Sequence, residues 1–320
     1  MLALDEAPSR SEVRERPGGR RREPWLRLLA LLLVSVLSFP ALGASITKRV
    51  GQVTFVVEDD AAVPGGFFVA RLLSRYGVGS AHVILDGRRS PTYPAGRGPR
   101  ALVPIPVDAS SGPVPIGFEI LSRKGRQRIP VDSTIAPRQA GVRRLAFSAE
   151  KGALLTLPEA ARDERVLLGL LRSQSLAPPE PLRSPVVGPI VGHGFGDRLV
   201  SADGARVAQR IDGTWGEFQR GLAFALPLGT PVRSPGRGTV LFAAPLTLAG
   251  NTIVIDHGQG LISVLLHLGR LDVGAGEGVL AGAPLGLSGD SGLTEGPVLE
   301  WRTYIHGIAV DPGLVQRSLD

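Results

Sequence analysis

The sequence contains no cysteine, and its single methionine is Met1. It can therefore form neither a disulfide nor a cysteine-ligated metal site, and cysteine usage says nothing about its redox compartment. Aromatic residues make up only 5%, whereas the 320 residues include 42 glycines and 27 prolines. This composition predicts many turns and short strands rather than long helices. A hydrophobic content of 43% supports packed cores, and the length is sufficient for two domains of ordinary size.

Acidic residues are outnumbered by basic ones, and the formal net charge is +7. A basic balance favours a negatively charged partner or surface. Nucleic acid is excluded as the preferred partner because the lysines and arginines are dispersed and no motif combines aromatic with basic residues.

Long apolar runs are also scarce. The main one, Leu28–Leu37, follows three consecutive arginines at 20–22 and precedes the small residues of Pro40–Ala44. This order is typical of a secretory signal, and the run is shorter than the roughly 20 residues that span a membrane comfortably. Residues 1–44 are therefore predicted to be a signal peptide or, alternatively, an uncleaved signal anchor. Either reading predicts export from the cytoplasm, with membrane contact only through this segment.

Residues 46–150 contain short apolar runs divided by turn residues. The runs are Val53–Val57, Phe67–Leu73, Ala81–Gly87, Ala101–Val107 and Ile116–Leu121. Their spacing predicts an antiparallel β-sandwich.

Residues 157–185 are predicted to form one helix and a proline-rich linker. Pro158 and Glu159 suit the first turn of a helix, and an apolar stripe follows at helical spacing. The stripe consists of Val166, Leu167, Leu170 and Leu171. We expect the helix to end near Ser175 and to pack on a neighbouring domain.

The last hundred residues carry the most specific patterns. They include GTPVRSPGRGTV at 229–240, NTIVIDHGQG at 251–260, LLHLGRL at 265–271 and GPVLEWRTYIHGIAVDP at 296–312. In this order they resemble the lysostaphin-type (LytM-like) zinc metallopeptidases, which hydrolyse peptidoglycan. The resemblance implies an antiparallel β-sheet domain over residues 186–320. A weaker similarity of PGGFFVARL, DGRRSPTY and RALVPIPVD implies that the preceding sandwich is immunoglobulin-like, as in some members of this family.

The residues that carry the chemistry in that family are largely replaced here. The family's zinc ligands are the His and Asp of H-x-x-x-D and the second His of H-x-H, and these positions align with Gln219, Ala223 and Glu300. Val298 replaces the first His of H-x-H, which assists catalysis in the family. Arg302 replaces a family glutamate. Because alternate residues of a strand share a face, we expect Val298, Glu300, Arg302 and Tyr304 to face this site and Leu299, Trp301, Thr303 and Ile305 to face the core.

His267 is the one family position that keeps its residue, and we interpret it as a vestige of a catalytic histidine. His257 is expected to be structural, at the end of a strand before a glycine turn. The other histidines, at 82, 193 and 306, show no spacing to a second ligand. A catalytic zinc needs about three protein ligands and an open position, so no zinc or other cofactor is expected.

These observations favour a mostly β exported protein of the cell envelope that has lost catalysis. It would bind peptidoglycan or regulate a cell-wall hydrolase such as an amidase, a role that the resemblance implies as one option. Two alternatives remain open: an active endopeptidase in which Glu300, His267 and an unrecognised ligand hold zinc, and a purely structural envelope module. Since fold alone does not specify function, the choice depends on the site.

Overall fold

The computed structural model describes residues 45–74, 81–96, 98–122, 125–191, 194–201 and 218–319. The chain divides into two units, Met1–Ala41 and Leu42–Asp320, and every element described below belongs to the second. The predicted export signal at residues 1–44 lies outside the described residues. Within the described ranges no helix is long and apolar enough to cross a membrane.

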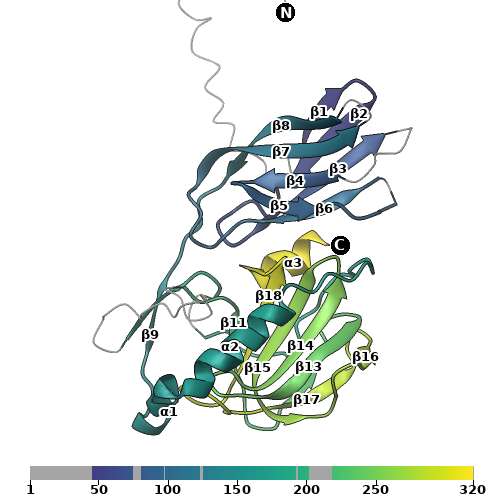
Figure 1. The fold of residues 1–320 in the computed structure, drawn as a ribbon. Helices are drawn as coiled ribbons and strands as arrows, with labels where there is room; N and C mark the ends of the chain where they lie inside the picture. Colours follow the sequence, from purple (N-terminus) through teal and green to yellow (C-terminus); the bar gives the residue numbers. More distant parts are fainter. Residues whose placement is uncertain are drawn as a thin grey trace, which may run out of the picture. The chain divides into compact units, whose positions relative to one another are not determined.

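The first half of the described chain forms two four-stranded antiparallel sheets (Figure 1). The first has the order β1-β2-β3-β6, with β1 at Ser45–Val50, β2 at Val53–Glu58, β3 at Phe67–Ser74 and β6 at Arg100–Pro104. The second has the order β5-β4-β7-β8, with β4 at Ala81–Leu85, β5 at Arg88–Pro91, β7 at Gly112–Ser122 and β8 at Gly125–Ile135.

The two sheets share one apolar core. Phe55 of β2 and Phe118 of β7 are fully buried, and their ring centroids lie 4.9 Å apart. Alternation drives this packing, since every second residue of a strand points to the same face. The predicted apolar runs all fall on strands of this sandwich, whereas its immunoglobulin-like character stays a prediction.

A connecting segment joins the sandwich to the C-terminal sheet. It contains β9 (Val142–Leu145), α1 (Ala149–Ala153), the 3-10 turn η2 (Leu154–Thr156) and α2 (Pro158–Leu170). β9 pairs in parallel with β10 (Arg198–Ser201). The linker at 177–185 follows α2 without regular secondary structure.

The single longer helix differs from its prediction in two respects. α2 begins at Pro158, as expected, but its C-cap is Leu171 rather than a residue near Ser175. Val166 is 42% exposed, whereas Leu167 and Leu171 are buried. The buried face therefore includes only part of the predicted stripe, because the sheet beneath the helix contacts the i, i+4 pair of Leu167 and Leu171 and leaves Val166 on the solvent side.

The C-terminal half forms a nine-stranded, mainly antiparallel sheet. Its main path has the order β11-β18-β15-β14-β13-β16, and β12, β17 and β19 pair at its margins. The strands are β11 at Leu222–Ala225, β12 at Pro231–Arg233, β13 at Gly238–Leu246, β14 at Gly250–Gly258, β15 at Leu261–Leu271, β16 at Gly278–Val279, β17 at Pro284–Ser288, β18 at Val298–Ile305 and β19 at Ile308–Val310. The chain continues into α3 (Pro312–Ser318), whose N-cap is Asp311.

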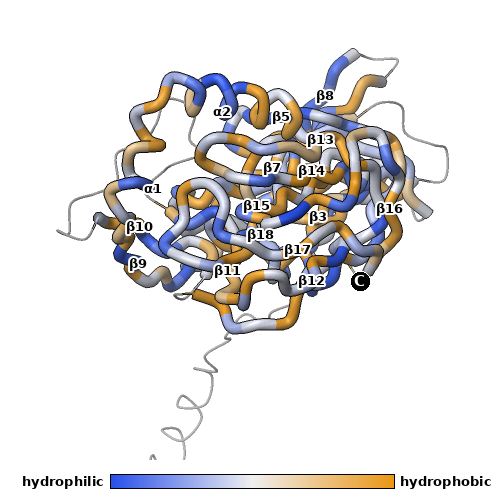
Figure 2. The backbone as a smooth tube through the Cα atoms, turned by 90° about the horizontal axis from the view of Figure 1, so that it is seen from below, coloured by the Kyte–Doolittle hydropathy of each residue, from blue (hydrophilic) through white to orange (hydrophobic). Residues whose placement is uncertain are grey.

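Both faces of this sheet are covered. One face carries the larger core, in which Leu299, Trp301 and Ile305 of β18 are completely buried, as the alternation predicts. The other face packs against α2 through Leu167 and Leu171. Figure 2 shows hydrophobic stretches along the central strands of this sheet and hydrophilic ones along α2. A sheet buried on both sides is rigid, and it fixes the positions of the side chains at its edge.

Candidate functional site

Strand pairing brings the predicted site segments together. β11 pairs with one edge of β18, and Ala223 lies opposite Glu300. β15 pairs with the other edge, where Leu266 lies opposite Glu300 and His267 is the next residue. Three segments that are distant in the sequence therefore meet around one carboxylate.

Gly221 allows the β11 segment to approach β18 closely. A Cβ placed on Gly221 would lie 2.5 Å from the carbonyl oxygen of Trp301 and 2.7 Å from Cγ of Arg302. Both distances are shorter than atoms tolerate, so only a residue without a side chain fits there. The glycine thus positions Gln219 beside Glu300.

Glu300 is the centre of a buried polar cluster. Arg302 Nε donates to Glu300 Oε1 at 2.7 Å, and Gln219 Nε2 donates to the same oxygen at 3.2 Å. His267 Nε2 lies 3.8 Å from the other oxygen, Oε2. Glu300 and Arg302 are only 9% and 8% exposed. Charge-assisted hydrogen bonds in such a buried setting are stronger than in water, so the cluster is firmly held.

A second layer of contacts covers this cluster from the connecting segment. Arg143 of β9 donates through Nη1 to Gln219 Oε1 at 2.9 Å and through Nη2 to Glu295 Oε2 at 3.1 Å. Glu295 Oε1 in turn accepts from the backbone N–H of Ala146 at 2.8 Å. These hydrogen bonds therefore connect the β9 segment to the site at two residues, Gln219 and Glu295.

His267 is held in one orientation by the backbone. Its Nδ1 lies 2.8 Å from the carbonyl oxygen of Ser291, and its own N–H donates to Ala249 O at 2.9 Å. A carbonyl only accepts, so Nδ1 carries the proton and Nε2 points toward Glu300. The residue has a positive φ of 65°. Non-glycine residues rarely adopt this backbone conformation, so the surrounding contacts must hold His267 in it.

The charges of Glu300 and Arg302 stabilise each other. Burial alone would raise the pKa of Glu300, but the charge of Arg302 and its hydrogen bond, together with the nearby His267 ring, hold that pKa well below its usual value. Burial would likewise lower the pKa of Arg302, and Glu300 reverses this and raises it. The pair is therefore an ionised carboxylate and a guanidinium.

The cavity that remains at this site is small. We call it the groove, and its volume is about 40 Å³. Its lining includes Gln219, Ala223, His267, Val298, Glu300 and Arg302, together with Arg143 and Glu295 of the covering layer. A water needs roughly 10–15 Å³ of such volume, so the groove holds a few waters or a small chemical group.

The residues at the site do not fit a catalytic zinc. Ala223 contributes a methyl group and Val298 an apolar side chain at two of the positions that the resemblance assigns to chemistry, and Glu300 is already bound by Arg302. Across the described ranges no group of three or more His, Asp or Glu side chains is arranged to hold a metal. Zinc needs about three such donors, and a guanidinium at 2.7 Å from the one carboxylate supplies positive charge in its place.

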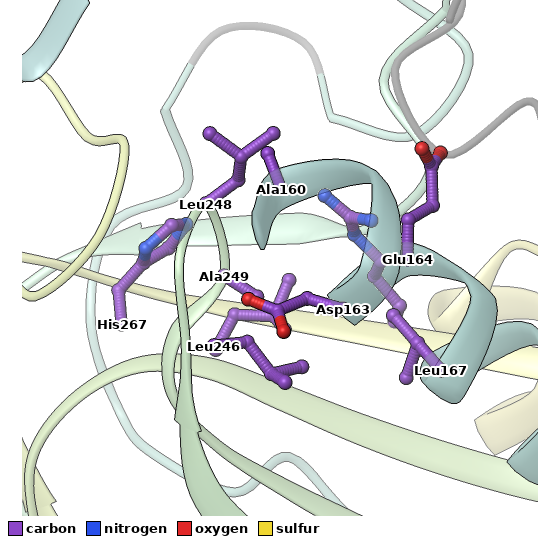
Figure 3. Close-up of a pocket in the computed structure, with 10 residues that line it drawn as sticks. Ala160, Asp163, Glu164, Leu167, Leu246, Leu248, Ala249 and His267 are labelled. Atoms are coloured by element: carbon purple, nitrogen blue, oxygen red, sulfur yellow. The ribbon is translucent and has the colours of Figure 1, made fainter. Parts of the chain in front are cut away.

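A second small cavity lies between the site and α2. Figure 3 shows Ala160, Asp163, Glu164 and Leu167 of the helix on one side and His267 on the other. Asp163 Oδ2 accepts from both N and Oγ1 of Thr247, at 2.7 and 2.6 Å. These bonds anchor α2 to the turn between β13 and β14, and Arg302 also lines this cavity. Tyr304, expected to face the site, packs instead in the apolar layer beneath α2.

Sequence reasoning missed Arg143 and Glu295. Glu295 immediately precedes the Gly-Pro of the last motif and could have been noticed for that reason. Arg143 lies 76 residues before its partner Gln219, in a segment without a motif, and nothing in the sequence joins the two.

The other histidines lie away from the groove or outside the described residues. His193 is outside them, His82 lies on β4, and His306 lies in the turn after β18. His257 is 3% exposed at the end of β14, where its Nδ1 lies 2.8 Å from Arg237 O. This placement agrees with a structural role, and burial lowers its pKa to about 4.

The buried His257 should make stability depend on pH. Its pKa falls from 6.5 in the unfolded chain to about 4 in the folded one, so the folded state favours the neutral ring. Its contribution is present above pH 6.5 and is lost as pH falls toward about 4, by about 3 kcal/mol of unfolding free energy. Urea unfolding at pH 7, 5.5 and 4 should show that the unfolding free energy of His257→Gln declines less steeply with falling pH than that of the native protein. If the unfolding free energies of the two proteins decline equally with pH, the lowered pKa of His257 is contradicted.

The chain matches Peptidase family M23 over residues 217–312. The match covers the C-terminal sheet and all the residues singled out in the groove except the covering Arg143. This confirms the resemblance, and the chain therefore carries a peptidase M23 domain of the LytM type. The loss of the zinc ligands in this domain stays a prediction.

Curated relatives share the same domain. The chain is 38% identical over 91 residues to "Peptidoglycan DD-endopeptidase ShyA" of Vibrio cholerae, a match that covers 28% of this chain and 21% of the relative. It is 32% identical over 99 residues to "DD-carboxypeptidase/endopeptidase Mpg" of Neisseria meningitidis, covering 31% of this chain and 23% of the relative. The chain thus spans less than a quarter of the length of these two relatives.

A solved structure matches more of the chain. A crystal structure from Pseudomonas aeruginosa, assigned to peptidase M23, covers 80% of this chain and 95% of that one, with 25% identity and a TM-score of 0.57. The similarity therefore extends beyond the M23 domain itself. It agrees with the mostly β fold predicted from the sequence.

Proposed function

We propose that this chain is a non-catalytic M23-domain protein of the bacterial cell envelope that binds peptidoglycan or regulates a cell-wall hydrolase such as an amidase. One observation carries the proposal. Arg302 and Gln219 both donate hydrogen bonds to Glu300. The three residues stand where the family resemblance expects two zinc ligands, at 219 and 300, and a glutamate, at 302. A carboxylate held by a guanidinium is a poor ligand for a cation, since the metal would have to displace the arginine.

The family of the domain supports the substrate class. One relative with the same domain is named as a peptidoglycan DD-endopeptidase and another as a DD-carboxypeptidase/endopeptidase, so a wall polymer or an enzyme acting on it is the partner that best suits this fold. The predicted leader at 1–44 supports an envelope location. The groove could engage one small group of such a partner, and Arg143 at its mouth has a side chain that is 15% exposed.

Arg143 provides the test of groove binding. Arg143→Glu places a second acid beside Glu295 and breaks the contact with Gln219, so binding to purified sacculi or to an amidase should weaken by about tenfold. Arg144→Glu is the matched control, because Arg144 is the next residue of β9, is exposed, and forms no side-chain contact with the described residues. Co-sedimentation with sacculi and pull-down with amidases measure the binding of both variants.

Two outcomes would contradict the proposal. If Arg143→Glu folds and binds as the native chain does, the groove has no binding role and the structural alternative, centred on the sandwich, is favoured. If the native chain releases soluble fragments from sacculi and loses this activity on Glu300→Ala, it is an active endopeptidase with an altered ligand set.

A further inference from the structure

The groove is not the most spacious cavity of the chain. A cavity of about 270 Å³ lies where the β4–β5 hairpin, the end of β6, the end of α2 and the turn after β18 come together. This volume is many times the roughly 10–15 Å³ that one water requires. We call it the arginine cavity, because Arg88, Arg89 and Arg172 line it.

The charge of this cavity is of one sign. None of its lining residues is an aspartate or a glutamate. Arg89 donates to Glu119 Oε2 at 3.0 Å, but the side chains of Arg88 and Arg172 form no hydrogen bond or ion pair with any described residue. Two guanidinium charges are therefore left without a counter-ion at a concave site, where field lines concentrate.

A buried hydroxyl adds a neutral donor. Ser90 follows Arg88 and Arg89 on β5, is only 3% exposed, and lines the cavity. Its hydroxyl makes no hydrogen bond within the described part of the chain. Ser90 Oγ is therefore available as a hydrogen-bond donor to a group bound in the cavity.

The remaining walls are apolar and neutral. Leu168 and Leu171 of α2 form one side, and Val103 and Pro104 of β6 form another. His306 closes the end and contributes no charge near neutral pH, because burial lowers its pKa to about 4. An apolar wall beside a cluster of arginines suits a molecule with an anionic head and an apolar body.

We propose that the arginine cavity binds the phosphate group of an amphipathic molecule, with Arg88 and Arg172 as the charged contacts and Ser90 as a hydroxyl donor. Guanidinium groups match the oxygens of a phosphate in pairs. A single phosphate dianion neutralises both unpaired charges, whereas carboxylates would have to enter as two separate groups. This site is independent of the groove and of the function proposed for it, because no residue lines both.

The test uses the full chain and three probes, namely inorganic phosphate, hexyl phosphate and glutarate, in calorimetric titrations at low salt. Hexyl phosphate should bind more tightly than inorganic phosphate, because its chain contacts the apolar walls. The double variant Arg88→Ala/Arg172→Ala should weaken the binding of hexyl phosphate by tenfold or more, an effect of about 1.4 kcal/mol or above. Added salt should weaken it as well.

Arg162→Ala is the matched control, since Arg162 is exposed on α2, the helix that precedes Arg172, and does not line the cavity. It should bind all probes as the native chain does. The proposal is overturned if no phosphate probe binds saturably at about 10 mM, if the double variant binds as well as Arg162→Ala, or if glutarate binds and phosphate does not. Equal affinity for inorganic and hexyl phosphate would contradict the amphipathic part of the assignment. Thermal unfolding of each variant confirms that it is folded.

Discussion

Arg302→Met should destabilise the protein by about 3–5 kcal/mol, because it leaves the carboxylate of Glu300 buried without its counter-charge. Glu300 is 9% exposed and would keep only the hydrogen bond from Gln219 and the neighbouring His267. The double variant Arg302→Met/Glu300→Leu should recover most of the loss, since removing both charges also removes the cost of burying them. Urea unfolding of the native protein, Arg302→Met, Glu300→Leu and the double variant measures the coupling between the two side chains.

The same chain offers a matched control pair. Arg270 and Asp272 are also two residues apart, and Arg270 Nε donates to Asp272 Oδ1 at 2.6 Å, but their side chains are 61% and 34% exposed to solvent. Arg270→Met should therefore change stability little, because water replaces the lost contact. If Arg302→Met costs no more than Arg270→Met, the charge pair does not organise the site.

The destabilisation caused by Arg302→Met should depend on pH through the pKa of Glu300. In the native protein that pKa lies below its ordinary value of 4.5, so the stability that it contributes is present above pH 4.5 and is lost as pH falls below it. In Arg302→Met the pKa should rise, because only burial and weaker partners remain. The difference in unfolding free energy between the two proteins should narrow as pH falls toward 4.5.

Zinc binding should appear when the family's ligands are restored. The native chain should hold far less than one zinc after dialysis, whereas Gln219→His, Ala223→Asp, Val298→His and Glu300→His combined with Arg302→Glu should hold about one. The strand register supports this design, because Ala223 lies opposite Glu300 and Gln219 Nε2 already lies 3.2 Å from Glu300 Oε1. Elemental analysis of dialysed protein measures the number of zinc ions per chain.

Arg302 supplies the internal control for the zinc experiment. A variant with the first four substitutions but with Arg302 retained should bind zinc more weakly, because the guanidinium lies against residue 300 and repels a cation. Wall hydrolysis should be weak even with all five changes, since supporting residues around the ligands are not rebuilt. A folded five-fold variant without zinc would show that these positions are not the ligand positions. Stoichiometric zinc in the native chain, lost on Glu300→Ala, would show that the site is a metal centre.

Local patterns were sufficient to predict most strands. The alternation in Val298–Ile305 assigned Leu299, Trp301 and Ile305 to the core, and the structure buries all three completely. The family motifs placed Gln219, Glu300 and His267 near one another, because motifs of this kind record which strands are neighbours. The helix was predicted less well: its end differs by several residues, and Val166 faces solvent. Periodicity alone does not decide which of two adjacent stripes meets the sheet.

The sequence by itself determined the mostly β class and the M23 domain, since both depend on residue identity and short-range spacing. It also predicts that the expected zinc ligands are replaced. Only the tertiary structure decided what occupies the site. Arg143 reaches Gln219 across 76 residues, and Arg88 of a strand and Arg172, directly after the C-cap of a helix, meet at one cavity although their segments share no motif. Such contacts depend on how whole elements pack, and packing depends on the summed burial of many side chains rather than on any local pattern.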